Sequence, residues 1–360
     1  MDPWGREEIE NYEKVLAQFG IEPISTILKK LPNPNHYFLR NIIFGHRDLI
    51  SIVQAIRSHR PWAVLTGLMP SGKFHLGHKM VCDQLIYYQK LGGEIFVTIA
   101  DIEAYLTRNK SIDEMRELAL TEYLQNYLAL GLDHRKLKIY FQSEGSPEYQ
   151  VISKFLARRI TKNEFSAIYG EMTPEKLISV LTQVADIFYP QMEEHGGPKP
   201  VVVPVGVDKD PHIRLTRDLA DRTKSEFGFL KPAASYHKHM RGIKGGKMSS
   251  SDPSSYIALT DPIKESLKKI DQALTGGRDT AEEQRKLGAV IEKDVVFELL
   301  AFHLITEDKK LKKIEEDYRS GKLMSGELKL IAKELLENFL IRHQKAWMAS
   351  ESRARKLLKV

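Results

Sequence analysis

The sequence has 360 residues, 42% of them hydrophobic and 28% charged, which is the composition of an ordinary globular protein. Cys82 is the only cysteine, which excludes a disulfide framework and a cysteine-based zinc or iron–sulfur site. The sequence shows neither a signal peptide nor an apolar run long enough to cross a bilayer, so we expect a cytoplasmic protein without membrane contact. The net charge of +6 weakly favours a polyanionic partner.

The first 58 residues are expected to form an N-terminal extension that covers the following domain. Residues 1–20 place apolar side chains on one helical stripe, which predicts an amphipathic helix. Prolines and asparagines at 32–35 indicate a loop. The partly apolar stretch 36–49 is typical of a strand, and 50–59 of a short helix.

A nucleotide-binding pattern follows. Residues 62–65 (WAVL) predict a strand, 66–78 (TGLMPSGKFHLGH) a turn, and 79–88 an amphipathic helix. A strand, a glycine turn and a helix start are the device by which α/β sheets commonly hold a nucleotide. Gly67 and Gly72 allow the backbone to pass close to a ligand, because they lack a Cβ.

His75 and His78 are three residues apart near this helix start, so their imidazoles can share one face. Two N–H donors at the positive end of a helix suit phosphate oxygens that gain charge in a transition state. The pair can also be a metal site or an idle surface pair. No third ligand follows nearby, so we rank phosphate contact first and a metal site second.

The next elements alternate between strand and helix. An apolar strand over 94–101 places Asp101 and Glu103 at its carboxyl end, where open α/β sheets bind ligands. For Asp101 the simpler interpretation, a cap on the following turn, is favoured. A helix over 111–131 and a strand over 137–141 follow.

A mainly helical insertion is predicted over about 143–182. Just after it, Gln183 and Asp186 are spaced to face the same way on an otherwise apolar helix. Because an unpaired buried carboxylate is costly, Asp186 either makes structural hydrogen bonds or serves as a polar handle for a ligand. The apolar run 200–207 predicts a further strand, and 213–223 a helix.

A second glycine-containing loop, 245–252 (GGKMSSSD), offers two glycines, a lysine and three serine hydroxyls. Alone, such a loop usually means solvated surface or a modification site. Residues 262–360 are predicted to be all helical, and the basic tail 343–360 is either a solvated face or a nucleic-acid contact.

These elements predict an α/β protein in three parts. The N-terminal extension (1–58) precedes a Rossmann-like parallel-sheet catalytic domain (59–261) that contains the helical insertion, and an all-α domain (262–360) follows.

The two glycine loops, taken together, resemble the paired ATP-binding signatures of class I aminoacyl-tRNA synthetases. Three further stretches resemble the tryptophanyl-tRNA synthetase family of archaea and eukaryotes: 38–48 (FLRNIIFGHRD), 206–218 (GVDKDPHIRLTRD) and 276–280 (GGRDT). The resemblance runs from about residue 37 to the C-terminus. It implies that tryptophan reacts with MgATP to give tryptophanyl-adenylate, and that the tryptophanyl group then passes to the 3′ end of tRNA(Trp). It also implies a homodimer formed through the insertion, and a helical domain that binds the anticodon.

The resemblance assigns roles to individual residues. It implies that catalysis of activation rests on His75, His78, Lys247, Ser249 and Ser250. The nucleotide would contact Thr66, Gly67, Gly77 and Met248. The amino acid would contact Leu65, Glu103, Gln183 and Asp186. ATP with its Mg²⁺ is the expected cofactor, and no resident metal is expected.

The chain departs from the family at the indole site. The tyrosine and glutamine that bind the indole in eukaryotic members are Leu65 and Thr98 here, and Lys209 replaces a further glutamine. Residues 184–187 (VADI) instead resemble the Ala-Ala-Asp-Ile of bacterial tryptophan enzymes, in which the aspartate accepts the indole N–H. We therefore hypothesise that Asp186 is the acceptor for the indole.

Three other functions are compatible with parts of the sequence. In a tyrosine enzyme Asp186 would accept the substrate hydroxyl, but Leu65 stands where such enzymes usually have a tyrosine. A nucleotidyltransferase that makes a small cofactor would be favoured if the chain ended near residue 260, but this sequence continues to residue 360. An inactive paralogue that binds RNA is disfavoured by the presence of His75, His78 and Lys247.

Overall fold

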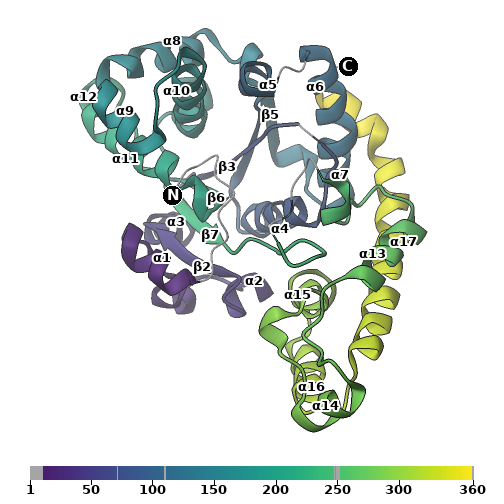
Figure 1. The fold of residues 1–360 in the computed structure, drawn as a ribbon. Coiled ribbons are helices and arrows are strands. Elements are labelled where there is room, and N and C mark those ends of the chain that lie inside the picture. Colours follow the sequence, from purple (N-terminus) through teal and green to yellow (C-terminus); the bar gives the residue numbers. More distant parts are fainter. Residues whose placement is uncertain (1–10, 71, 109–110, 247, 249–251, 359–360) are drawn as a thin grey trace.

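The computed structural model describes residues 11–70, 72–108, 111–246, 248 and 252–358 (Figure 1). Within these residues the chain forms a seven-stranded sheet in the order β1-β2-β7-β6-β3-β4-β5. The strands β7, β6, β3, β4 and β5 are parallel to one another. β2 is antiparallel to its neighbour β7, and β1 is antiparallel to β2. The strands are β1 Glu22–Pro23, β2 Ile43–Arg47, β3 Ala63–Leu68, β4 Glu94–Ile99, β5 Leu137–Phe141, β6 Val201–Gly206 and β7 Ala233–His237. The predicted α/β class is confirmed.

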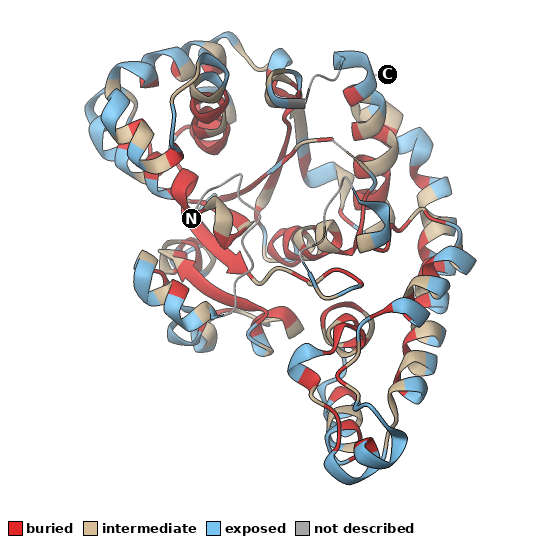
Figure 2. Ribbon diagram, viewed as in Figure 1, coloured by how far each residue is buried: buried red, intermediate tan, exposed pale blue. Residues whose placement is uncertain are grey.

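Helices cover both faces of this sheet, so its central strands are buried along nearly their whole length (Figure 2). Val64 packs into the hydrophobic core on one face, and Leu65, the next residue, packs into the core on the other. The helices between Leu49 and Leu130 are α3 Leu49–Arg57, α4 Leu76–Lys90, α5 Asp101–Arg108, α6 Ile112–Leu118 and α7 Gln125–Leu130. The later ones are α8 Pro147–Leu156, α9 Lys162–Tyr169, α10 Pro174–Phe188, α11 Asp210–Arg222 and α12 Lys224–Phe227.

Several elements differ from the sequence-based expectation. The stretch 36–49 is not one strand, because Asn35 caps a short helix, α2 His36–Leu39, by accepting the Tyr37 N–H at 3.1 Å, and β2 follows. β1 and β2 extend the central sheet, so the predicted N-terminal extension contributes two strands to it. Of the predicted N-terminal helix, α1 Tyr12–Phe19 is described, and residues 1–10 lie outside the described part.

β7 was not predicted. Its sequence, AASYH, contains no β-branched residue, yet all five residues are buried between β6 and β2. The predicted helix over 111–131 is present as one helical run, in which a π-helical segment, Ala119–Leu124, joins α6 to α7.

The C-terminal part is helical, as expected. Its helices are α13 Ile263–Gln272, α14 Ala281–Leu287, α15 Val295–Leu299, α16 Asp308–Arg319 and α17 Ser325–Leu358, with a π-helical turn at Leu300–Leu304. The first glycine of the GGRDT motif, Gly276, is needed for packing: a Cβ there would lie 2.0 Å from the Val290 carbonyl oxygen.

The described part of the basic tail, residues 343–358, belongs to the long helix α17, which runs back along the catalytic domain (Figure 1). One side of this helix is docked on the run from α6 to α7. Three side chains of α17 make hydrogen bonds there: His343 with Asn126 (2.7 Å), Trp347 with the Thr121 carbonyl (3.0 Å) and Ser350 with the Gln125 carbonyl (3.1 Å). Only the outer side of the tail is therefore available to a partner.

Candidate active site

The helix that follows the first glycine loop, α4, begins with an unusual cap. His75 is its N-cap residue, and the His75 Nδ1 accepts the Gly77 N–H at 3.1 Å. The His78 Nδ1 in turn accepts the His75 N–H at 3.2 Å. Two imidazoles thus form the reciprocal capping box that Ser or Thr and Glu usually make. The ring centroids lie 3.9 Å apart, so the predicted shared face is confirmed.

This cap determines where the imidazole protons are. Burial lowers the pKa of His75 to about 4. Burial, and then the neighbouring His75, also hold the pKa of His78 well below its ordinary value. Both rings are therefore neutral at pH 7, and each Nδ1 is occupied as an acceptor. The single ring proton is consequently on Nε2 in both, which leaves two N–H donors for a ligand.

The two glycine loops meet at Gly77. A Cβ at this position would lie 3.0 Å from the His75 Cε1 and 3.3 Å from the Met248 methyl group. A side chain at this position would thus press on the capping imidazole, so glycine suits it for a structural reason in addition to any ligand. Met248 comes from the second loop; Lys247, Ser249 and Ser250 lie outside the described residues, as does Ser71.

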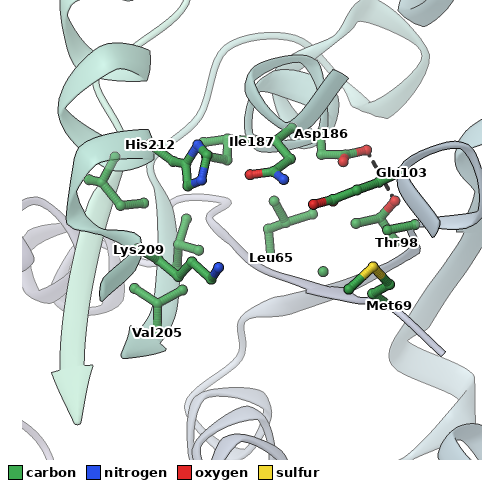
Figure 3. A pocket seen from close by; sticks show the side chains of 14 residues that line it. Leu65, Met69, Thr98, Glu103, Asp186, Ile187, Val205, Lys209 and His212 are labelled. Atoms are coloured by element: carbon green, nitrogen blue, oxygen red, sulfur yellow. Dashed lines mark hydrogen bonds between the residues drawn. The ribbon is translucent and has the colours of Figure 1, made fainter. Parts of the chain in front are cut away.

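A cavity of about 250 Å³ lies at the carboxyl ends of β3, β4 and β6 (Figure 3). It is lined by Leu65, Gly67, Met69, Thr98, Ala100, Glu103, Gln183, Asp186, Ile187, Val203, Val205, Lys209, His212 and Ile213. All four side chains predicted to contact the amino acid are among them. Thr66 is buried within β3, between two of the lining residues, Leu65 and Gly67.

The register of the sheet explains this convergence. Leu65 pairs with Phe96 and Gly67 with Thr98, so the two strands end side by side. A Cβ on Gly67 would approach the Thr98 methyl group to 3.2 Å, so a larger residue would narrow the cavity. α10, which contributes Gln183 and Asp186, packs against β3 and α5.

The Asp186 carboxylate accepts four hydrogen bonds from described side chains. Its Oδ1 accepts hydrogen bonds from the hydroxyls of Thr98 (3.0 Å), Tyr140 (3.0 Å) and Tyr149 (2.8 Å), and its Oδ2 accepts one from Gln142 (2.8 Å). Burial raises the pKa of Asp186 to about 7, even though these four hydrogen bonds favour the ionised form.

This arrangement narrows the role that Asp186 can have. Oδ1 is saturated by three donors, whereas Oδ2 accepts a single bond from the described residues and can take one more. The proposal that Asp186 accepts an indole N–H stays a prediction, and Oδ2 is the oxygen to which it applies.

Sequence reasoning missed Tyr140, Tyr149 and Gln142. Of these, only Gln142 had a signal, because it directly follows a strand end.

Two charged side chains enter the cavity from different elements. Figure 3 shows Glu103, from α5, and Lys209, from the turn after β6, approaching the space beside Leu65 from opposite sides. The Lys209 ammonium also lies 3.8 Å from the Asp208 carboxylate. The cavity therefore offers an anion and a cation above apolar walls.

Asp101, at the end of β4, has a structural role. Its Oδ1 accepts the N–H groups of Ile102 (3.0 Å) and Ser143 (3.1 Å), and its Oδ2 accepts the Ser143 hydroxyl. The expected structural role is therefore present, but the carboxylate mainly joins the end of β4 to Ser143, after β5, and within its own turn it accepts only the Ile102 N–H. Among the described residues, no cluster of three or more His, Cys, Asp or Glu is arranged to hold a metal ion. In the same part of the chain, no helix is long and apolar enough to span a membrane.

Comparison with known proteins identifies the family. The family "tRNA synthetases class I (W and Y)" matches residues 57–341. The tryptophan–tRNA ligase of Hyperthermus butylicus is 49% identical over 96% of this chain and 94% of its own length. The crystal structure of the tryptophanyl-tRNA synthetase from Aeropyrum pernix superposes with a TM-score of 0.94 at 47% identity, over 99% of this chain and 98% of that one.

A more distant relative is the tryptophanyl-tRNA synthetase of Encephalitozoon cuniculi, whose structure contains bound tryptophan. It has a TM-score of 0.82 at 27% identity, over 96% of this chain and 98% of that one. The family match covers most of the chain, and the relatives extend it to nearly the whole length. The chain therefore belongs to the class I tRNA synthetases of the tryptophan and tyrosine group.

Proposed function

We propose that this protein activates tryptophan with MgATP and transfers the tryptophanyl group to the 3′ end of tRNA(Trp). The observation that supports this most is the site itself: an amino-acid-sized cavity lies at the carboxyl ends of β3, β4 and β6, and β3 leads to α4, whose start offers two neutral imidazole donors. The relatives named tryptophan–tRNA ligase support the choice of tryptophan over tyrosine.

The cavity suits a zwitterion with an apolar side chain. Glu103 would bind the substrate ammonium, as the family resemblance implies, and Lys209 would attract its carboxylate. The walls, formed by Leu65, Val203 and Ile187 among others, would enclose the indole. Oδ2 of Asp186 would then accept the indole N–H.

In the activation step the substrate carboxylate attacks the α-phosphorus of ATP and pyrophosphate leaves. Catalysis of such a displacement rests mainly on positioning and on stabilisation of charge. The Nε2–H groups of His75 and His78 would donate to the triphosphate. Lys247, Ser249 and Ser250 would hold the departing pyrophosphate, and Mg²⁺ would arrive with the nucleotide as part of the substrate.

Two partners are proposed. The helical domain (262–360) would bind the anticodon, and the outer side of α17 would contact the RNA through the exposed Lys345, Arg353 and Lys356.

The interface of a homodimer would be formed by exposed apolar side chains on the packed helices α8 and α10, namely Val151, Phe155 and Ile178. Light scattering that gives the mass of one 41.2 kDa chain at all concentrations would contradict the dimer.

The function is tested by ATP–pyrophosphate exchange measured with each of the twenty amino acids. We expect tryptophan to support exchange and tyrosine and phenylalanine to be rejected. The same preparation should charge tRNA(Trp). Exchange that is fastest with tyrosine, or no exchange with any amino acid, would overturn the proposal.

The imidazole donors can be tested without disturbing the helix cap. In His78→Asn the side-chain oxygen can replace Nδ1 as acceptor, but the donor at Nε2 is lost. We expect adenylate formation to slow by about a hundredfold, as on loss of one transition-state donor, with tryptophan affinity nearly unchanged. His78→Gln, which places an amide N–H near the position of Nε2, should recover part of the rate. Equal single-turnover rates for a folded Asn variant and the wild type would refute the role.

Asp186 predicts a pH dependence of tryptophan binding. Its carboxyl has a pKa of about 7, so the charged acceptor becomes populated as the pH rises through 7. Tryptophan should therefore bind more tightly at pH 8 than at pH 6. In Asp186→Asn this dependence should disappear, and affinity at pH 8 should fall by roughly 1.5–3 kcal/mol, the range for a hydrogen bond to a charged group. If the wild type activates 1-methyltryptophan as well as tryptophan, Asp186 does not recognise the indole N–H.

The RNA contact can be tested on exposed side chains only, because truncating α17 would uncover residues packed on α7. We expect the triple variant Lys345→Gln, Arg353→Gln, Lys356→Gln to bind tRNA more weakly. The slope of the logarithm of the binding constant against the logarithm of the salt concentration should fall by about one for each residue replaced. Amino-acid activation should not change. Lys224→Gln, on the exposed surface of α12, is the control. Unaltered tRNA affinity in the triple variant would show that this side of the helix is merely solvated.

A further inference from the structure

The segment that follows the second glycine loop is paired with the start of α4. Two backbone hydrogen bonds make this connection, from the Leu76 N–H to the Ile257 carbonyl (3.2 Å) and from the Leu259 N–H to the Phe74 carbonyl (3.0 Å), and together they form an antiparallel bridge between His75 and Ala258. The Tyr256 ring also lies 4.8 Å from the His75 ring, centroid to centroid. The position of segment 256–261 therefore constrains the position of His75.

Lys269 reaches this segment from α13, the first helix of the C-terminal part. Its Nζ lies 2.9 Å from the Pro253 carbonyl oxygen, 2.8 Å from that of Tyr256 and 3.1 Å from Oδ2 of Asp261. These three acceptors match the three N–H donors of an ammonium group. The side chain is only 17% exposed, so the charge is committed to this contact and is not a solvated surface charge.

Asp261 extends the contact to the first glycine loop. Its Oδ1 accepts a hydrogen bond from the Lys73 ammonium at 2.7 Å. Burial alone would raise the pKa of Asp261, but the hydrogen bonds from Lys73 and Lys269 hold it below its ordinary value. The carboxylate is thus ionised at neutral pH and lies between cations from two different parts of the chain. Gln344, from α17, donates to the Leu259 and Asp261 carbonyls and secures the same segment (3.0 and 2.8 Å).

We propose that Lys269 is a positioning residue for the activation step, which acts through residues 253–261 on the imidazole at the start of α4. This inference rests on the function proposed above. Without the ammonium, two carbonyl oxygens and a buried carboxylate lose their shared donor, so the segment is held less firmly in its place beside Phe74 and His75. The cavity for the amino acid lies elsewhere, at the ends of β3, β4 and β6, and should be unaffected.

The test compares Lys269→Met with Lys268→Met, its exposed neighbour on the same helix. Adenylate formation is measured in single turnover at saturating ATP and tryptophan, and tryptophan affinity is measured separately. We expect Lys269→Met to form adenylate at least tenfold more slowly, with tryptophan affinity within twofold of wild type. Lys268→Met should match the wild type, and Lys269→Arg, which keeps a cation and several donors, should recover much of the rate.

The outcomes separate the two hypotheses. A wild type that forms no tryptophanyl-adenylate overturns the proposed function, and the inference with it. An active wild type with an equally fast Lys269→Met overturns the inference alone, as does a variant that loses tryptophan affinity and rate in parallel. If Lys269→Met does not fold, Lys269→Gln replaces it, because the amide keeps polar donors at this position without the positive charge. A rate equal to wild type in Lys269→Gln then contradicts the inference.

Discussion

The geometry of the nucleotide site depends on how the first turn of α4 satisfies its free N–H groups. Every helix leaves such donors at its N-terminus, and a side chain or ligand must accept from them. Here two imidazoles do so through Nδ1, at 3.1 and 3.2 Å. A structural requirement of the helix thereby fixes the tautomer of both rings, and Nε2–H of each remains for chemistry. The pKa values, lowered by burial, keep the rings in this neutral state.

Much of the rest of the site serves to hold this turn in place. The chain returns after the second glycine loop to pair with residues 74–76, and Asp261 connects Lys73 to Lys269. α17 contacts the same segment through Gln344. The helical part, which we propose binds RNA, is therefore in direct contact with the segment beside the nucleotide site. A change in the position of the helical part would therefore reach the nucleotide site by direct contact, through hydrogen bonds and packed backbone.

The sequence predicted the parts of this protein whose signal is local. The strand, glycine turn and helix around His75 were predicted in the right order because turn residues and apolar periodicity act over a few positions, although the strand extends to Leu68 and the helix begins at Leu76. β7 was missed because its small residues carry no strand preference; its two neighbours in the sheet and its burial determine its conformation.

In the site, Asp186 was identified as a polar residue that needs partners, and both interpretations of it remained open. Its partners Tyr140 and Tyr149 come from β5 and α8, and no local pattern indicates that the fold brings them together. The docking of the basic tail on α7 is likewise a tertiary contact that charge alone does not reveal.

The central claim, that the helix cap holds both imidazoles neutral with the proton on Nε2, is tested most directly by side-chain ¹⁵N NMR of His75 and His78 between pH 5 and 8. Assignment would come from the single His→Asn variants. The account predicts that neither ring titrates in this range, and that in both rings Nε2 is protonated and Nδ1 is not. A ring that becomes charged above pH 5, or that carries its proton on Nδ1, would contradict it.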